Sequence, residues 1–138
     1  MAEAFLPYSG EAAQLDGLIN VWAEYRFHLA TAIMAVVNKA IVLDDVIEAQ
    51  FSGYTVKIPD WGDIAEDPDE RAYSDAALMT WTHNGGFVGE EIVAWYVADS
   101  GYTKLLFIRP YLAPIVMNAS GHQIKLLPRI LLGDLAPP

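Results

Sequence analysis

The sequence predicts a mainly β fold, an antiparallel β-sandwich or jelly roll with a short N-terminal helix. Short stretches alternate between apolar and other side chains, which is the pattern of half-buried strands. Residues that tolerate tight turns separate these stretches, at Asn84-Gly85-Gly86, Asp99-Ser100-Gly101 and Asn118-Ala119-Ser120-Gly121. Because helical stretches do not alternate with the strands, we expect antiparallel sheets and not a parallel one.

The N-terminal part predicts an arm followed by a helix. Residues 1–10 are interrupted by Pro7 and Gly10 and are expected to form the arm. Over residues 11–22, apolar side chains recur at helical spacing. A chain of 138 residues fits one domain, residues 1–138, in which residues 25–132 form the sandwich and residues 133–138 a C-terminal tail.

The first predicted strand is Tyr25–Thr31, where Tyr25, Phe27 and Leu29 share one side. Leu43–Gln50 predicts one or two helical turns, and Asp60–Glu70 predicts a polar loop. Further strands are expected at Tyr54–Ile58, Ala77–His83, Glu91–Ala98, Thr103–Arg109, Pro114–Met117 and Gln123–Leu132. Pro128 is expected to split the last of these strands, because proline lacks the N–H that a sheet requires.

The composition limits the partners. Eighteen Asp and Glu against eight Lys and Arg give a net charge of −10, which repels nucleic-acid phosphates and anionic lipid headgroups. The longest apolar stretch, Leu29–Val37, is too short to span a membrane. The opening Met1-Ala2-Glu3-Ala4 predicts no secretion signal, and the absence of cysteine excludes disulfides and thiol chemistry. We therefore expect neither nucleic acid nor a membrane as a partner.

The sequence predicts no catalytic, cofactor-binding or metal-binding residues. His28, His83 and His122 are far apart, and no serine lies in a G-x-S-x-G motif. The acidic residues between Asp60 and Asp75 lack the spacing of a calcium loop, although they provide enough oxygen atoms for a cation. A small hydrolase that uses two of these carboxylates stays open, but the protein is expected not to be an enzyme.

Apolar side chains at the termini and in two strands predict protein contacts. The stretches Ile92–Val97 and Lys104–Ile108 are apolar on both faces, which predicts either a covered sheet or a subunit interface. Trp61 lies beside the polar loop, so it is expected at the surface. The predicted interface residues are Phe5, Leu6, Tyr8, Trp61, Leu131, Leu132 and Leu135.

An ordered series of strand and turn residues resembles a known group of proteins. The series comprises Phe51–Tyr54, Met79–Gly86, Ala94–Ser100, Leu105–Arg109 and Ala113–Met117. Between Phe51 and Leu132 it resembles small proteins encoded among the structural genes of tailed phages and related metagenomic sequences. These are similar in kind to the jelly-roll cement or decoration proteins of phage heads, which have no catalytic residues.

The resemblance implies a structural virion protein, made in the host cytoplasm and bound to the outer capsid surface. Its implied partners are the major capsid protein, whose subunits it would bridge, and itself, as a dimer or trimer. The alternative is a tail or fibre module that binds host carbohydrate through Trp61 and nearby aromatic side chains.

Overall fold

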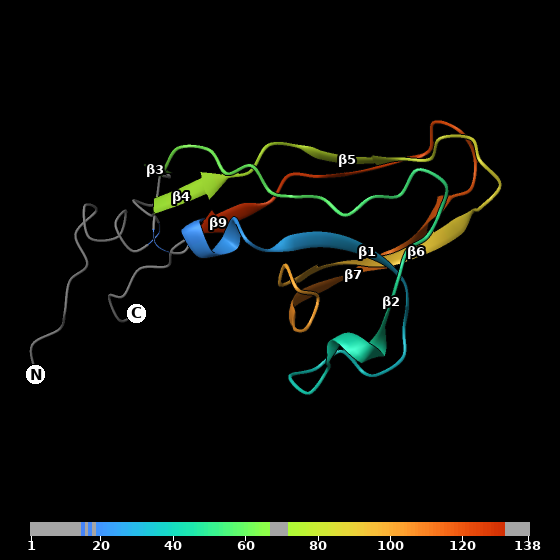
Figure 1. The fold of residues 1–138 in the computed structure, drawn as a ribbon, viewed down its shortest axis with the longest axis horizontal. Helices are drawn as coiled ribbons and strands as arrows, with labels where there is room; N and C mark the ends of the chain where they lie inside the picture. The colour runs from blue at the N-terminus through green and yellow to red at the C-terminus, as the bar shows by residue number, and fades with distance from the viewer. Residues whose placement is uncertain (1–14, 16, 18, 67–71, 132–138) are drawn as a thin grey trace, which may run out of the picture. The chain divides into compact units, whose positions relative to one another are not determined.

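The computed structural model describes residues 15, 17, 19–66 and 72–131, and it is mainly β (Figure 1). Strands account for 48% of the described residues and helix for 8%. All strand pairings among the described residues are antiparallel. The predicted fold class is therefore confirmed. The arrangement is compatible with a β-sandwich, whereas the jelly roll stays a prediction.

The chain forms two compact units, each assembled from separate stretches of sequence. Unit 1 comprises Met1–Ala23, Pro59–Leu78 and Leu127–Pro138, and unit 2 comprises Glu24–Ile58 and Met79–Leu126. The division therefore follows packing and not the order of the sequence. A single domain over residues 1–138 stays a prediction.

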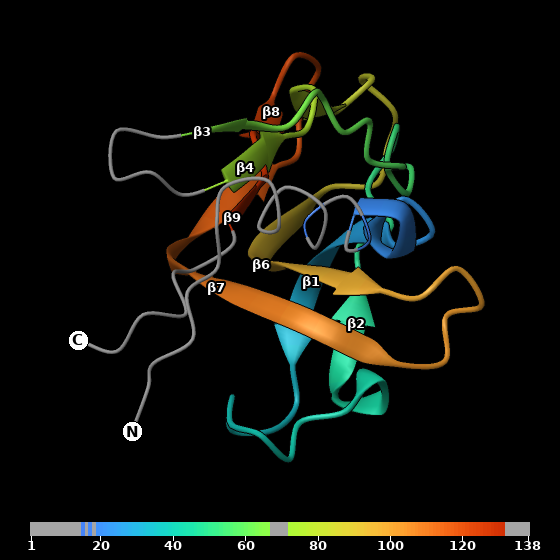
Figure 2. The same ribbon diagram turned by 90° about the vertical axis from the view of Figure 1, so that its left-hand side faces the viewer.

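A four-stranded sheet forms the body of unit 2, in the order β2-β1-β6-β7. Its strands are β1 (Arg26–Ile33), β2 (Val46–Glu48), β6 (Glu90–Ala98) and β7 (Leu105–Met117). Figure 2 shows β1, β6 and β7 side by side. The end of β6 is buried at three consecutive positions, Tyr96, Val97 and Ala98, so both faces of the sheet are covered there. The sheet is therefore covered at this end of β6, whereas Leu106 and Phe107 of the second apolar stretch are exposed, so a subunit interface stays a prediction.

One core cluster packs residues of this sheet against the segment that links β1 to β2. It consists of Ala30, Leu43, Val46, Ala94, Tyr96 and Ala98. The linking segment contains a single 3-10 turn, η1 (Leu43–Asp45). The predicted helical turns over Leu43–Gln50 are therefore wrong beyond Asp45, because the backbone from Val46 onward pairs with β1 instead. Tertiary pairing overrides a weak local helix signal.

A two-stranded sheet of β5 (Met79–Thr82) and β8 (Gln123–Leu126) completes unit 2. Trp81 lies opposite Ile124, is 1% exposed, and donates its Nε1–H to the carbonyl oxygen of Thr55 at 2.8 Å. The predicted strand Tyr54–Ile58 is wrong, because that segment makes only an isolated bridge in the described structure, between Lys57 and Phe27. The Trp81 side chain, and not the backbone of a neighbouring strand, donates the hydrogen bond to the Thr55 carbonyl.

Two predicted strands, Thr103–Arg109 and Pro114–Met117, form the single strand β7. The strand is continuous through a shift in its register with β6, since Ile92 pairs with Ile115 whereas Ala94 pairs with Pro110. More residues of β7 than of β6 lie between these pairs, which produces a bulge. A proline is tolerated within β7 because the strand is at the edge of its sheet.

The turns that the sequence predicts use different residues for positive φ. Gly85 has a φ of 90° and Gly121 a φ of 88°, as expected for glycines in tight connections. After Asp99-Ser100-Gly101, however, Tyr102 adopts the positive φ, at 54°. A bulky residue in this region is strained, so local contacts must hold Tyr102 in place.

Unit 1 contains a three-stranded sheet of β3 (Ala65–Glu66), β4 (Ala72–Asp75) and β9 (Arg129–Leu131), in the order β3-β4-β9. The predicted loop Asp60–Glu70 is thus wrong at Ala65 and Glu66. The split of the last strand is confirmed, because Pro128 separates β8 from β9 and its carbonyl accepts the Ala76 N–H at 2.9 Å. Residues 15, 17 and 19–22 are helical, within the predicted helix.

Candidate functional site

The first candidate site is an apolar surface along β7, at the edge of the unit 2 sheet. We call it the β7 surface and define it by the exposed side chains of Leu106, Phe107, Leu112 and Val116. Leu112 is fully exposed, and the other three are exposed by 38–43%. Single exposed apolar side chains are common, but several along one element mark an interaction surface.

The β7 surface favours contact through side chains. Among the described strands, β7 pairs only with β6, so its outer backbone edge meets no other strand. Pro110 and Pro114 lack N–H groups and make this edge a poor template for an added strand. A partner would therefore contact the apolar side chains more readily than it would extend the sheet.

Phe107 packs against a row of two further aromatic rings. Its ring stacks on Trp95 of β6 with ring centres 5.2 Å apart, and Trp95 stacks on Phe27 of β1 at 5.8 Å. Phe27 is 1% exposed and belongs to the core. Phe107 is thus held by packing while part of its ring is available to a partner.

A concave region adjoins the bulge in β7. Its volume is about 550 Å³, and it is lined by Trp95, Arg109, Pro110, Tyr111, Leu112 and Ala113. A hollow of this size, bordered by the fully exposed Leu112, is suited to an inserted apolar side chain of a partner.

The β7 surface also lies in an unusual segment of the sequence. Residues 100–133 contain no Asp or Glu and carry Lys104, Arg109, Lys125 and Arg129, in a chain whose net charge is −10. An acidic partner would be repelled by most of this chain but not by this segment. The sequence alone contains this signal, and our prediction of interface residues missed it.

The second candidate site is a polar network centred on His28 of β1, which is 3% exposed. Its Nδ1 atom is paired with Glu48 Oε2 of β2. The same oxygen accepts a hydrogen bond from the Tyr54 hydroxyl at 2.7 Å, and the Leu29 N–H donates to that hydroxyl at 3.2 Å. The other ring nitrogen, Nε2, is buried and has no hydrogen-bond partner among the described residues.

The network shifts the pKa values of its acidic members in opposite directions. Burial acts to raise the pKa of Glu48, but the hydrogen bonds from His28 and Tyr54 outweigh it and leave that pKa below its usual 4.5. Burial, together with the hydrogen bond to Glu48, raises the pKa of Tyr54 far above its ordinary value. Glu48 is therefore the charged acceptor of this network, and Tyr54 is a neutral donor.

Two further tyrosines enclose the His28 ring. Tyr96 stacks on it with ring centres 4.9 Å apart, and Tyr102 meets it edge-on at 5.0 Å. The hydroxyl groups of Tyr96 and Tyr102 are hydrogen-bonded at 2.7 Å. The positive φ of Tyr102 thus places its side chain against the network.

Asp99 fixes the turn that presents Tyr102. Its carboxylate accepts hydrogen bonds from the Thr103 N–H at 2.7 Å, the Thr103 hydroxyl at 2.6 Å and the Lys104 N–H at 2.8 Å. These bonds, first that from the Thr103 side chain, lower the pKa of Asp99 to about 2. Its carbonyl also accepts the Tyr102 N–H at 3.0 Å. The strained residue is therefore held by several local bonds.

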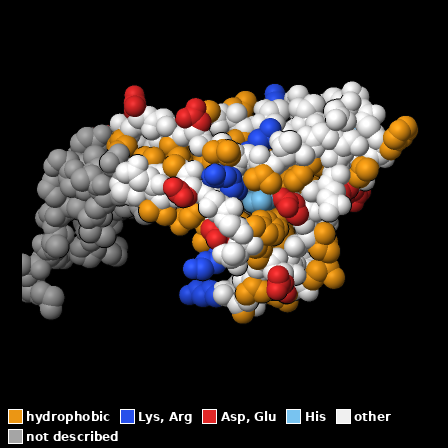
Figure 3. Space-filling view, viewed as in Figure 1, with side chains coloured by type: hydrophobic (Ala, Val, Ile, Leu, Met, Phe, Trp, Pro, Cys, Tyr) orange, Lys and Arg blue, Asp and Glu red, His pale blue; other side chains and the backbone are white. Residues whose placement is uncertain are grey.

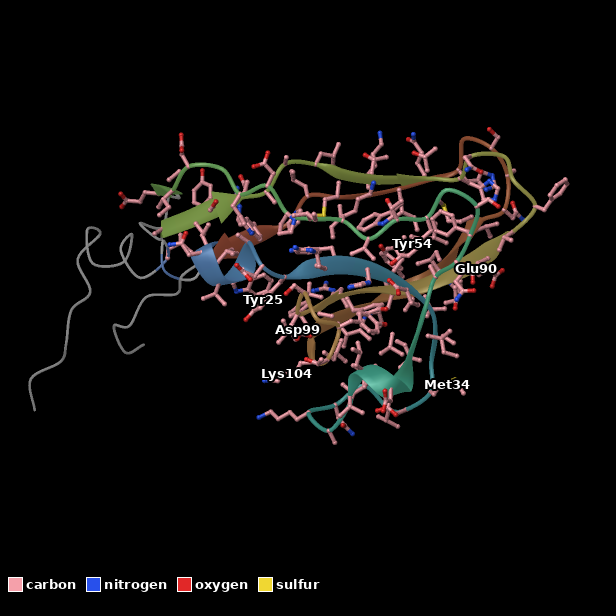
Figure 4. All side chains as sticks on the ribbon, viewed as in Figure 1. Tyr25, Met34, Tyr54, Glu90, Asp99 and Lys104 are labelled. Carbon is pink, nitrogen blue, oxygen red and sulfur yellow. The ribbon has the colours of Figure 1, made fainter. Side chains whose placement is uncertain are left out.

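A pocket of about 360 Å³ opens beside this network, and its lining includes Arg26, His28, Glu48, Val56, Asp99 and Tyr102. Figure 4 labels Tyr54 and Asp99, which come from different loops of unit 2. Figure 3 shows acidic and basic side chains interspersed with hydrophobic ones on the drawn face. The pocket therefore combines a cation, carboxylates, an imidazole and a phenol ring.

Neither of the predicted interface residues that the structure describes, Trp61 and Leu131, belongs to these two sites. Phe5, Leu6, Tyr8, Leu132 and Leu135 fall outside the described residues, and Leu131 is described only as part of β9, where its backbone pairs with Tyr73. Trp61, in unit 1, is only partly exposed.

The ring of Trp61 meets Trp22 edge-on with ring centres 6.2 Å apart. Its Nε1 atom is buried without a hydrogen-bond partner in the described part of the chain. The face of Trp61 is thus partly occupied by another aromatic side chain, which limits its use as a flat platform for a sugar.

Sequence reasoning also missed the members of the polar network. His28 and Glu48 are twenty residues apart, so no short motif contains both. Across residues 15, 17, 19–66 and 72–131, no three His, Cys, Asp or Glu side chains come together as metal ligands. In the same part of the chain, no helix has the length and apolar character needed to cross a bilayer.

The two units and their sites define a mainly β protein with antiparallel sheets. In comparisons with known proteins, no family model matches the chain, and neither a curated protein nor a solved structure matches it. The function must therefore be inferred from the sequence and from the geometry of the two sites.

Proposed function

We propose that this protein is a structural virion component that decorates the outer surface of a tailed-phage head and bridges capsid subunits, with the β7 surface as a contact. The observation that carries the proposal is the set of four exposed apolar side chains along β7, within a segment free of acidic residues. Its resemblance to small phage structural proteins supplies the biological setting. Such a protein acts by binding, and binding needs no catalytic group.

The shape and charge of the β7 surface support this role. A partner side chain can enter the hollow beside Leu112, while Phe107 offers a supported aromatic contact. Lys104 and Arg109 border the surface and suit an acidic partner. The partners in this proposal are the major capsid protein and further copies of this chain, as a dimer or trimer.

The test is to add the purified protein back to phage heads from which it has been removed. Wild-type protein is expected to rebind and to raise the temperature at which the heads disassemble. Leu112→Ser is expected to weaken binding at least about tenfold, since one buried leucine contributes roughly 1.5–3 kcal/mol and 1.4 kcal/mol corresponds to a factor of ten. Bound protein can be measured by sedimentation of the heads.

Phe87→Ser is the matched control. Phe87 is fully exposed and also belongs to unit 2, but it lies close to Glu90 and Glu91 in the chain and outside the acid-free segment. It is expected to leave binding unchanged. Equal losses from both substitutions would contradict the assignment of the contact to β7, and failure of the wild-type protein to bind heads would reject the proposed function.

A further inference from the structure

We propose that the pocket beside His28 binds a neutral, hydroxyl-rich ligand of monosaccharide size. This site is separate from the β7 surface, and it does not depend on the capsid role. It also differs from the predicted carbohydrate site at Trp61, because its residues belong to unit 2.

The first argument is the unpartnered nitrogen of His28. The histidine is 3% exposed, and its Nε2 has no hydrogen-bond partner in the described structure, although Nδ1 is paired with Glu48. Buried polar atoms in proteins are nearly always hydrogen-bonded, so an unpartnered ring nitrogen in a residue that lines the pocket calls for a ligand or an ordered water. A hydroxyl group can serve either protonation form of this nitrogen, since it both donates and accepts.

The second argument is the charge of the pocket lining. Arg26 provides a positive charge and Glu48 and Asp99 provide negative charges within one lining. A small anion would meet two carboxylates as well as the guanidinium group, and a small cation would meet the guanidinium group as well as the carboxylates, so either charge meets both attraction and repulsion. A neutral ligand with several hydroxyl groups meets no such repulsion, and it can donate to the carboxylates and accept from arginine.

The third argument is the aromatic ring of Tyr102, which is 39% exposed. Tyrosine offers an apolar face and a polar edge, as the C–H face and hydroxyl groups of a sugar ring require. The apolar Val56 also lines the pocket. The pocket volume of about 360 Å³ falls within the range of known small-ligand sites.

The fourth argument is the strain stored at Tyr102. Its φ of 54° is unfavourable for a bulky side chain, and such residues cluster at ligand-binding and active sites. The bonds of the Asp99 carboxylate and the hydrogen bond to Tyr96 hold the ring in its position before any ligand arrives. A preformed site loses less conformational entropy on binding.

The experiment is a titration of the full-length ¹⁵N-labelled protein followed by NMR. The probes are glucose, galactose, mannose and N-acetylglucosamine, each at millimolar concentration, with glutamate and lysine as charged probes. At least one sugar is expected to shift the amide signals of Ser100, Gly101 and Tyr102 in a saturable way. Binding of only the charged probes, or no saturable shift with any sugar, would overturn the proposal.

Two substitutions test the site itself. Tyr102→Gly removes the ring and suits the positive φ, so the backbone is expected to stay folded; it should weaken sugar binding at least tenfold. Glu48→Gln should weaken it by a similar factor, and the dispersion of the amide spectrum reports whether each variant is folded. Trp61→Ala is the control and should leave the affinity unchanged. Sugar binding that survives Tyr102→Gly, or that is lost in Trp61→Ala alone, rejects this pocket as the site.

Discussion

Two buried histidines in unit 2 have similar burial but different surroundings. His28 is 3% exposed and His83 is 1% exposed, and each stacks on an aromatic ring, His28 on Tyr96 and His83 on Phe51. Both nitrogens of His83 are satisfied, since Nε2 donates to the Val88 carbonyl at 2.8 Å and Nδ1 accepts the Gly85 N–H at 3.0 Å. Only one nitrogen of His28 has a partner among the described residues.

The difference separates a structural role from a candidate binding role. The bonds of His83 go to the backbone of the turn after β5, so the ring holds together one connection of the chain. The one bond of His28 goes to the side chain of Glu48, which also accepts a hydrogen bond from Tyr54, and the other ring nitrogen is unpaired in a residue that lines a pocket. Burial alone does not distinguish these roles, whereas the full set of hydrogen-bond partners does.

The largest expected effect is that of His83→Phe. The new ring keeps the contact with Phe51 but leaves the Val88 carbonyl and the Gly85 N–H without their partner. We expect the free energy of unfolding to fall by about 3 kcal/mol. Urea denaturation measures it, and His122→Phe is the control.

His122 is only partly buried, and its ring accepts a hydrogen bond from the Asn118 N–H at 3.2 Å. Its substitution is expected to cost less than 1 kcal/mol, because water can replace that bond. A loss in His83→Phe no larger than that in His122→Phe would show that the turn does not depend on His83.

A smaller effect is expected for His28→Phe, of about 1 kcal/mol. The substitution keeps the ring contacts with Tyr96 and Tyr102 and loses the bond to Glu48, but it also removes the unpartnered Nε2. Removal of this buried, unpaired nitrogen is favourable and offsets part of the stability lost with the Glu48 bond. A double-mutant cycle with Glu48→Gln measures the coupling between the two residues by urea denaturation. If His28→Phe is as costly as His83→Phe, the contrast between the two histidines fails.

The smallest expected effect is a change in the acid limb of stability. Glu48 has a lowered pKa in the folded protein, so its contribution is present above the unfolded value, near 4.5, and is lost as the pH falls through the folded value. Glu48→Gln should therefore flatten the decline in unfolding free energy below about pH 4.5.

Asp75 and Asp99 also have lowered pKa values, the first chiefly through its bond with Arg129. The measurement is therefore the difference between wild type and Glu48→Gln over a series of pH values, with Asp99→Asn as the comparison. Parallel curves for wild type and Glu48→Gln would mean that the bonds from His28 and Tyr54 do not stabilise the carboxylate.

The sequence by itself determined the features that depend on neighbouring residues. The alternation of side chains predicted β1, the apolar stretch predicted β6, glycines marked the turns at Gly85 and Gly121, and Pro128 marked the break between β8 and β9. These signals are local, because side-chain period, φ preference and the missing proline N–H act within a few residues. The charge segregation that borders β7 was also readable from the sequence.

Only the tertiary structure decided which distant residues meet. The pairing of β2 with β1 brings Glu48 to His28, and the connection after β6 brings Tyr102 to the same ring. The same global pairing turned Val46–Glu48 into a strand, joined two predicted strands into β7, and left Tyr54–Ile58 with only an isolated bridge to β1 in the described structure. Strand order and register bring these groups together, and neither is encoded in the spacing of one short segment.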